Sequence, residues 1–353
     1  MSKFLNSKYK SLEVYTPGEQ PQDKKYIKLN TNESPYPPSK KVVEAVSVAE
    51  IENLRLYSDP ECKRLRGAIA ELYGVEAENV YLSNGSDDIL NFAFMAFASD
   101  NSPAVFPEIS YGFYKVFAEL HGIPYKRIPL CEDFSISPSD YYNANGLVVI
   151  ANPNAPTGLA LTLSEVESIV ASNPENVVLI DEAYVDFGAE SAVALTKKYK
   201  NLLVVQTFSK SRSMAGARLG FAIADKGLID DLNRIKYSTN PYNVNRLTLV
   251  AGEAAIKENG YYLENCKKVM DARAYAKAEL EALGFLVLDS KANFLFAKSN
   301  RIGGEELYLK LKENGILVRH FKDEKIKDYN RITVGTKEDM RILVDTVKKL
   351  LEE

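Results

Sequence analysis

Between residues 80 and 225, short runs of aliphatic residues alternate with stretches of helical periodicity. We expect helices over residues 87–98 and 113–121, from Leu163 and near Ala192. The runs expected to be strands are VYLSNG, PAVF, LVVIANPN, VVLIDEAY, LLVVQTFSK and LGFAIA. Continuous Val, Ile and Leu indicate strands that are buried on both faces. The alternation therefore predicts an α/β fold, a three-layer domain in which helices cover both faces of a mostly parallel sheet.

The alternation of strands and helices ends after about Tyr237, where the polar segment NPYNVNR follows. A helical stretch then runs toward Leu283, with a break expected at Asn259 and Gly260. Further on, FLVLDS, NFLFAKS, EELYLKLKENG, ILVRHF and RITVGT describe a small α+β unit. A last helix closes this unit, and Thr336 with Asp339 resembles a capping box at its start. At 353 residues the chain is long enough for one large domain and a smaller one.

The proline-rich segment NTNESPYPPSK, residues 30–40, cannot be a central strand or a helix interior, because proline removes a hydrogen-bond donor and restricts the residue before it. It is expected to be an ordered arm or loop. The predicted division is an N-terminal arm over 1–38, a large domain over 39–240, and a small C-terminal domain over 241–353 that begins with a bridging helix. A ligand is expected between the domains, at the carboxyl ends of the large-domain strands.

Composition excludes several classes of function. No apolar run approaches the roughly 20 residues that span a bilayer, and the N-terminus lacks the apolar stretch of a secretory signal. The net charge of -4, with lysine and glutamate interspersed, offers no basic face for nucleic acid. Three widely spaced cysteines and two histidines indicate neither a disulfide framework nor a metal centre. We expect a cytoplasmic protein that acts on small molecules.

Three predicted strands end in polar groups. They are NPNAPTG at 152–158, DEAY at 181–184, and SK at 209–210, which Arg218 follows. Taken singly, such residues are usually caps, turn residues or solvated lysines. In a parallel sheet, however, these ends point into one crevice, so the ordered set indicates a site.

A longer series of motifs covers nearly the whole chain: LNTNESPYPP, RLYSDPEC, SNGSDDIL, PEISYGFY, NPNAPTG, DEAYVDF, TFSKSRSMAGARLGF, ANFLF, GILVRHF and RITVGT. With these motifs the sequence resembles the fold-type I aminotransferases that depend on pyridoxal 5'-phosphate (PLP), and more narrowly the histidinol-phosphate aminotransferases. No GxGxxG follows a strand, which counts against a nicotinamide-binding domain.

The resemblance implies a role for each residue around the cofactor ring. Lys210 would hold the PLP aldehyde as a Schiff base and then act as the general base that moves a proton. Asp181 would keep the pyridine nitrogen protonated, which strengthens the ring as an electron sink. Tyr184 would hydrogen-bond the phenolic oxygen of the ring, and Tyr111 would stack on its face.

The resemblance also implies which residues bind the anionic groups of the cofactor and the substrate. The cofactor phosphate is assigned to Gly85, Ser86, Asp87, Ser209 and Arg218, because glycine permits close approach, and helix N-terminal amides favour an anion. Tyr57 would reach the phosphate from the neighbouring subunit, which implies a homodimer with shared active sites. Substrate anions are assigned to Arg319 and Arg331, whose guanidinium forks suit carboxylate and phosphate. Tyr15, Asn32 and Asn293 are further matches, expected as substrate or closing contacts.

The sequence departs from the family pattern at one position. An asparagine that donates to the phenolic oxygen normally precedes PTG, and here that position is Ala155. Either Asn154 replaces it through a small backbone shift, or Tyr184 acts alone. With one donor fewer, we expect the bound cofactor to titrate at a higher pH than in relatives that keep the asparagine.

The function implied is amino transfer between L-histidinol phosphate and 2-oxoglutarate or glutamate in histidine biosynthesis. Two alternatives share the scaffold: a threonine-phosphate decarboxylase and an aromatic amino-acid aminotransferase. A third is a binding protein without catalysis. Retention of Lys210, Asp181, Tyr184 and Arg218 together counts against it, because binding alone does not require a proton-transferring lysine.

Overall fold

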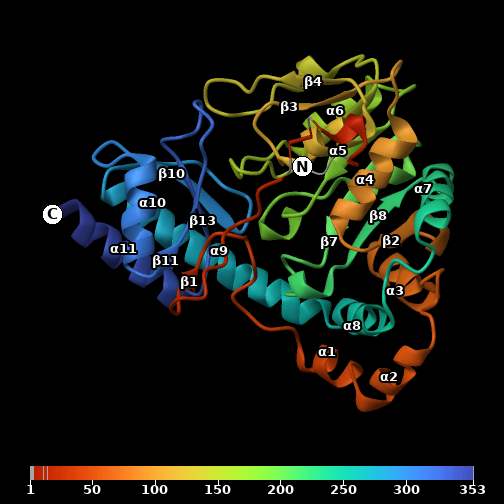
Figure 1. The fold of residues 1–353 in the computed structure, drawn as a ribbon, viewed down its shortest axis with the longest axis horizontal. Coiled ribbons are helices and arrows are strands. Elements are labelled where there is room, and N and C mark those ends of the chain that lie inside the picture. The colour runs from red at the N-terminus through yellow and green to blue at the C-terminus, as the bar shows by residue number, and fades with distance from the viewer. Residues whose placement is uncertain (1–3, 11, 14, 353) are drawn as a thin grey trace.

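The computed structural model describes residues 4–10, 12–13 and 15–352, which form a larger lobe and a smaller lobe that carries the C-terminus (Figure 1). The larger lobe is built on a seven-stranded sheet of order β2-β8-β7-β6-β5-β3-β4. Its strands are β2 Val80–Ser83, β3 Ala104–Pro107, β4 Tyr125–Ile128, β5 Leu147–Ala151, β6 Val178–Asp181, β7 Leu202–Thr207 and β8 Gly220–Ala224. Only β8 is reversed among these strands, since it pairs antiparallel with both β2 and β7. The predicted mostly parallel α/β sheet is confirmed.

The sheet is buried on both faces, as the continuous aliphatic runs predicted. In β5, Val148 and Ile150 belong to one hydrophobic cluster, whereas Leu147 and Val149 belong to another on the opposite face. The helices of this lobe are α1 Lys40–Ala45, α2 Val48–Glu52, α3 Lys63–Tyr73, α4 Ser86–Phe97, α5 Phe113–His121, α6 Leu163–Ala171 and α7 Lys226–Thr239. The predictions for α4, α5 and α6 are confirmed to within a residue or so at their starts.

The helix expected near Ala192 is present as a short 3-10 helix, η6, at Ala192–Lys197. Its first amide donates to the buried carboxylate of Glu182 at 2.6 Å. This bond fixes the start of the segment, and β7 begins at Leu202, so little chain remains for a longer helix.

The smaller lobe holds an antiparallel sheet of order β12-β13-β10-β9. Its elements are β9 Phe285–Val287, β10 Phe294–Ser299, α10 Gly304–Glu313, β11 Ile316–Leu317, β12 Arg319–His320, β13 Asn330–Thr333 and α11 Lys337–Glu352. The capping box before α11 is confirmed, because the Asp339 amide donates to the Thr336 hydroxyl oxygen and the Thr336 amide donates to the Asp339 carboxylate.

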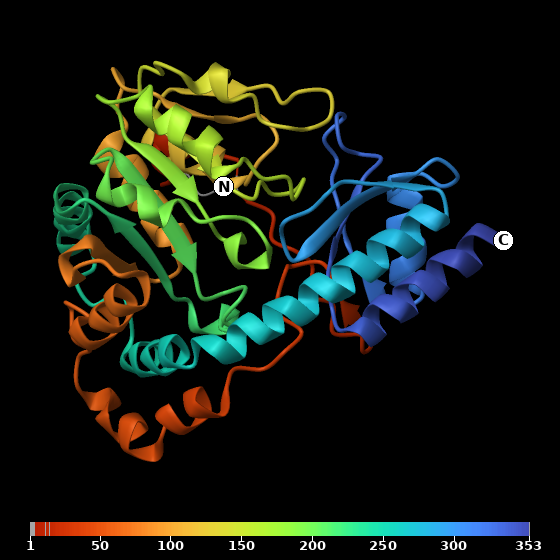
Figure 2. The same ribbon diagram turned by 180° about the vertical axis from the view of Figure 1, so that it is seen from behind.

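Two consecutive helices, α8 Arg246–Lys257 and α9 Asn259–Ala282, join the lobes and meet at Glu258, next to the expected break. Figure 2 shows α9 running from the large lobe into the small one. Near its start, Tyr262 packs into the large-lobe core, whereas Ala276 and Leu280 pack into the small-lobe core. No helix in the described part of the chain is both long and apolar enough to cross a membrane.

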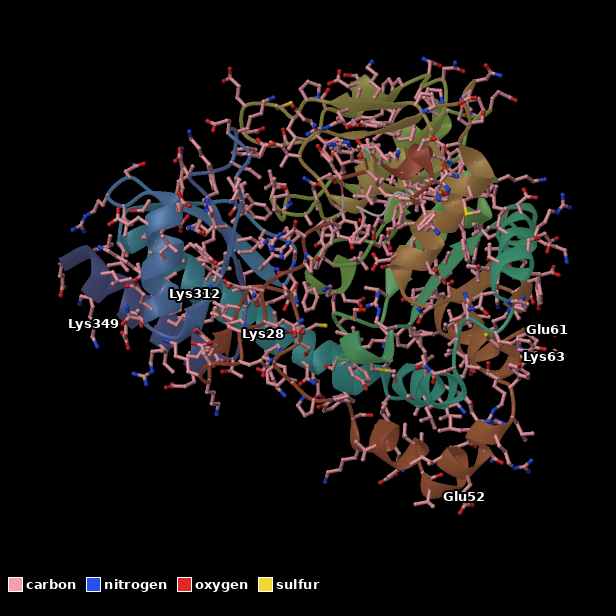
Figure 3. All side chains as sticks on the ribbon, in the orientation of Figure 1. Lys28, Glu52, Glu61, Lys63, Lys312 and Lys349 are labelled. Atoms are coloured by element: carbon pink, nitrogen blue, oxygen red, sulfur yellow. The ribbon has the colours of Figure 1, made fainter. Side chains whose placement is uncertain are left out.

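The N-terminal arm is attached to the small lobe. Its strand β1, Ile27–Lys28, pairs in parallel with β11. Figure 3 labels Lys28 on this strand and Lys312 on α10. Lys28 forms an ion pair with Glu33 at 2.8 Å, and Lys312 forms one with Glu19. After β1, the arm reaches the large-lobe strand ends, because the Thr31 carbonyl accepts a hydrogen bond from Lys210, which follows β7.

Candidate active site

A cavity of about 160 Å³ lies where the strand ends of the large sheet face the arm. Because β8 is reversed, its amino end, with Arg218 just before it, meets the carboxyl ends of β2, β6 and β7. The cavity is lined by Thr31, Glu33, Ser86, Asp87, Tyr111, Ala151, Ala155, Asp181, Ala183, Tyr184, Thr207, Ser209, Lys210, Ala215 and Arg218. Most of the residues that the sequence assigned to a cofactor therefore lie around one pocket.

Lys210 follows the end of β7 and provides the amine of the pocket. Its Nζ donates to the Thr31 carbonyl oxygen of the arm at 3.2 Å and lies 5.9 Å from the centre of the Tyr184 ring. Burial, with a further contribution from the positive charge of Arg331, lowers the pKa of Lys210 to about 8. The neutral amine needed for nucleophilic attack and proton transfer is thus accessible near neutral pH.

Asp181, the last residue of β6, provides a buried carboxylate with 4% exposure. Its Oδ2 accepts from the Tyr114 hydroxyl at 2.8 Å and its Oδ1 accepts from the Ala183 amide at 3.2 Å. Burial raises the pKa of Asp181 to about 6, and these two hydrogen bonds oppose that rise. The sequence analysis did not single out Tyr114, because its position three residues after Tyr111, near the start of a helix, is equally typical of a core residue.

Two tyrosines form further walls. The Tyr184 hydroxyl accepts a hydrogen bond from Asn32 Nδ2 at 3.0 Å, and its ring packs edge-on against Phe294 with centroids 5.1 Å apart. The Tyr111 hydroxyl donates to Asp87 at 2.8 Å. Both rings therefore have fixed positions on the cavity surface.

The end of the pocket at the start of α4 suits an anion. Gly85 has a φ of 87°, and a Cβ there would lie 2.6 Å from the Arg218 guanidinium. Glycine is required, because it tolerates positive φ and leaves this space open. Arg218 pairs with Asp87 at 3.0 Å, and Ser209 lies 3.0 Å from the Thr207 hydroxyl. Helix amides, two hydroxyls and a guanidinium thus converge where a phosphate would bind.

Two arginines face each other in the small lobe. Arg319 and Arg331 are directly opposite in the register of β12 and β13. Arg331 donates to the Asn30 carbonyl at 3.1 Å, and Arg319 donates to the Thr16 and Pro17 carbonyls at 3.0 and 3.1 Å. Within the described residues neither has a carboxylate partner in an ion pair. Opposed like charges are destabilising, so an anion that binds both would offset their repulsion.

The remaining residues expected near substrate lie around these groups. Tyr15 stacks on Phe113 with centroids 4.2 Å apart and lies 6.4 Å from the Tyr111 ring. Asn293 is buried and donates to the Asn32 carbonyl at 3.0 Å. In this structure Asn32 and Asn293 therefore brace the wall between the arm and the small lobe.

Asn154 and Tyr57, both assigned to the cofactor, are not brought to this pocket, and the substrate candidates do not line it either: Tyr15, Asn32, Asn293, Arg319 and Arg331 lie outside its lining. The Asn154 amide donates to the Ile109 carbonyl at 3.0 Å and its oxygen accepts from Ser110 at 2.8 Å, so it has no group left for the cavity. Ala155 lines the cavity instead. Tyr57 is 80% exposed and stacks on Tyr242 at 4.5 Å.

The residues present fit PLP. The pocket offers an amine of lowered pKa for the aldehyde, a buried carboxylate for the pyridine nitrogen, and an anion site for the phosphate. The Gly85 turn keeps the last of these open. An amine, a carboxylate and an anion site on three different strand ends form the donor set that PLP requires.

Residues 24–347 match the family described as aminotransferase class I and II. The chain belongs to this family, and it is a PLP-dependent aminotransferase. A histidinol-phosphate aminotransferase from Brachyspira hyodysenteriae is 53% identical over 353 residues, with 100% of both chains covered. Another histidinol-phosphate aminotransferase, from Marinomonas sp., is 51% identical over 353 residues, covering 99% of this chain and 100% of the relative.

Among solved structures, a histidinol-phosphate aminotransferase from Sinorhizobium meliloti in complex with pyridoxal-5'-phosphate has a TM-score of 0.89 to this chain. The two share 20% sequence identity over 100% of this chain and 98% of the other. At that identity the likeness establishes the common fold.

Proposed function

We propose that this aminotransferase moves an amino group between L-histidinol phosphate and 2-oxoglutarate or glutamate, in histidine biosynthesis. The observation that carries the proposal is the opposed pair Arg319 and Arg331, which are bound by carbonyls and so keep their charge for a ligand. In this amino transfer, the substrate of one half-reaction carries a phosphate and the substrate of the other is a dicarboxylate. Guanidinium forks accept both. The full-length relatives described above support the same substrate.

The chain's own residues would share the chemistry as follows. When bound, PLP supplies an electrophilic carbon and an electron-withdrawing ring. Lys210 Nζ takes up and returns the proton during amino transfer, because its lowered pKa leaves it partly neutral. Asp181 would hold the ring nitrogen, while Ser86, Ser209 and Arg218 would hold the phosphate.

The aromatic residues around the arginines orient substrate and exclude water. Arg331 lies over Phe294 at 5.4 Å, and Phe321 lies beside both arginines at 5.9 and 6.0 Å. Tyr15, near Tyr111, covers the adjacent side. Apolar surroundings strengthen the pairing of a guanidinium with an anion, since water competes less.

The half-reaction tests this function. The PLP-loaded protein is mixed with histidinol phosphate in the absence of an acceptor, and visible absorbance and released carbon dioxide are followed together. We expect the visible band to fall without carbon dioxide. Release of carbon dioxide from threonine phosphate, with no reaction of histidinol phosphate, would show that the protein is a decarboxylase. A higher specificity constant for a phosphate-free aromatic amino acid would make it an aromatic aminotransferase.

We also propose that the enzyme is a cytoplasmic homodimer in which Tyr57 serves the partner's phosphate site. The high exposure of Tyr57 supports this role. So do several exposed apolar side chains in the segment that precedes it, namely Val43, Val48, Ile51, Leu54 and Leu56. Light scattering should give twice the chain mass of 39.4 kDa. Tyr57→Phe should weaken PLP binding several-fold; a monomer with unchanged PLP binding in this variant would contradict the proposal.

We propose the domain division as an arm over 1–38, a large domain over 39–240 and a small domain over 241–353. The sheets on either side of the connection support this division, since the large sheet ends at Ala224 and the small one begins at Phe285. The helices α8 and α9 form the bridge at the start of the last part.

A further inference from the structure

Asn32 in the arm is fully buried and has a left-handed backbone, with a φ of 56°. Thr333 fixes its side chain. The Thr333 hydroxyl accepts a hydrogen bond from the backbone N–H of Asn32 at 2.9 Å and donates one to Asn32 Oδ1 at 3.0 Å. Asn293 holds the Asn32 carbonyl at 3.0 Å. The oxygen of the Asn32 side chain is thereby turned toward Thr333, and the nitrogen is turned toward Tyr184.

This orientation determines how Tyr184 can use its hydroxyl group. The oxygen accepts from Asn32 Nδ2 at 3.0 Å, so its own proton is left for a different acceptor. Tyr184 lines the cavity, and its ring is held edge-on to Phe294. With PLP bound, the acceptor on the cavity side would be the phenolic oxygen of the cofactor, the group that the family resemblance assigns to this tyrosine.

The large-lobe wall offers no amide at this place. Ala155 has no donor, and both ends of the Asn154 side chain are engaged with residues 109, 110 and 157. The buried amide that reaches Tyr184 belongs to Asn32, which lies 152 residues away in the chain.

We propose that Asn32 is a positioning residue that fixes the Tyr184 hydroxyl as a donor into the pocket, and that it compensates for the missing asparagine at position 155. The inference rests on the proposed site, in which PLP lies against Tyr184. A donor that is fixed in this direction stabilises the deprotonated phenolic oxygen, so it lowers the pH at which the visible band of the bound cofactor titrates.

Other charged groups also act on this hydroxyl. Arg331, Asp181 and Asp87 contribute to its electrostatic surroundings, and Lys210 lies near its ring. Glu33 and Arg218 act on Lys210 in turn. The variants below leave all six groups in place, so that a change in titration reports on the Asn32 amide.

The test is a pH titration of the visible absorbance of the PLP-loaded protein. Asn32→Gly removes the amide and tolerates the positive φ. We expect its midpoint to rise by about 0.5 to 1 pH unit, the size expected for one hydrogen bond. In a Tyr184→Phe background the same substitution should cause no further rise. The matched control is Asn30→Ala, which removes a buried amide of the same arm that donates to the Glu19 carbonyl; its midpoint should not move.

If Asn32→Gly fails to fold, Asn32→Asp keeps the size and suits the left-handed backbone. Its carboxylate accepts from Tyr184 rather than donating, so the midpoint should rise further. An unchanged midpoint in the folded variants, or an equal rise in the Tyr184→Phe background, overturns the inference. Failure of the site itself looks different, because the natural protein would then show no visible band that depends on Lys210.

Discussion

The two walls of the pocket are built in different ways. In the large-lobe wall, Asp181 and Lys210 sit at or just beyond the ends of strands buried within the sheet. In the wall made by the arm and the small lobe, Arg319 and Arg331 are held by arm carbonyls. Carbonyl oxygens orient a guanidinium without neutralising it. The first wall thus fixes an amine and a carboxylate at strand ends, while the second presents two guanidinium groups that keep their charge.

The largest effect should come from the first wall. Lys210→Ala removes the amine that we propose holds the cofactor and moves the proton, so we expect kcat to fall by about 10³-fold or more. The visible band should also disappear. Stopped-flow absorbance and steady-state rates measure both. Arg331→Ala should keep the band, and a Lys210→Ala protein with natural turnover would remove the distinction between the walls.

A substitution in the second wall should weaken the use of substrate more than the binding of cofactor. Arg331→Lys replaces a planar fork with a point charge, so we expect kcat/KM for histidinol phosphate to fall about 10- to 100-fold. PLP affinity should stay within about twofold. Arg301→Lys, an exposed position in the same lobe that bonds to the Leu351 carbonyl, is the control. Equal losses of PLP and substrate binding would show that the walls are not separable.

In the absence of cofactor, the buried carboxylate of Asp181 in the first wall should lower the stability of the folded protein. Burial raises the pKa of Asp181 from 3.8 to about 6, so between these values the folded protein binds more protons than the unfolded chain. The stability of the PLP-free protein therefore falls as pH rises through that window. Asp181→Asn should stabilise it by about 2 kcal/mol at pH 7.

Urea unfolding at pH 7 and pH 4 measures this effect. The gain should shrink at pH 4, near the bottom of that window, where the carboxyl is largely protonated in the folded protein and partly protonated in the unfolded chain. PLP binding should weaken in the same variant. A gain in stability that is equal at both pH values would show that burial of the Asp181 carboxylate does not destabilise the protein.

The smallest effect concerns the place where the walls meet. Ala155→Asn restores the usual donor to the large-lobe wall, so we expect the absorbance midpoint to fall by about 0.5 to 1 pH unit. In this background Asn32→Gly should shift the midpoint less. An unchanged midpoint for Ala155→Asn contradicts the expectation that one donor is missing.

The predictability of the site from sequence follows the same division. The strand ends at Asp181 and Lys210 are local patterns, and they could be placed on one edge of a parallel sheet. The role of Asn32 could not, because its contacts with Tyr184 and Thr333 join residues 152 and 301 positions apart. Tyr114 was missed because a buried tyrosine in an amphipathic helix has the same pattern as core. Asn154 fits the motif, but its amide bonds elsewhere.

The fold shows a similar limit. Aliphatic runs predicted six of the seven strands in the large sheet. They missed β4, because Lys126 and Arg127 on this edge strand are exposed. They also could not give the direction of β8, since aliphatic residues pack alike in parallel and antiparallel pairs. That direction is what brings Arg218 to the pocket.

The pairing of β1 with β11 has a consequence for synthesis in the cell. Ile27 and Ile316, which are partners in this pair, lie near opposite ends of the chain. At about 5 to 20 residues per second on the ribosome, the arm waits roughly 15 to 60 s for its partner strand. The large sheet is complete in the nascent chain well before then. The strand ends around Lys210 are therefore synthesised before β11, the strand that anchors the arm to the small lobe.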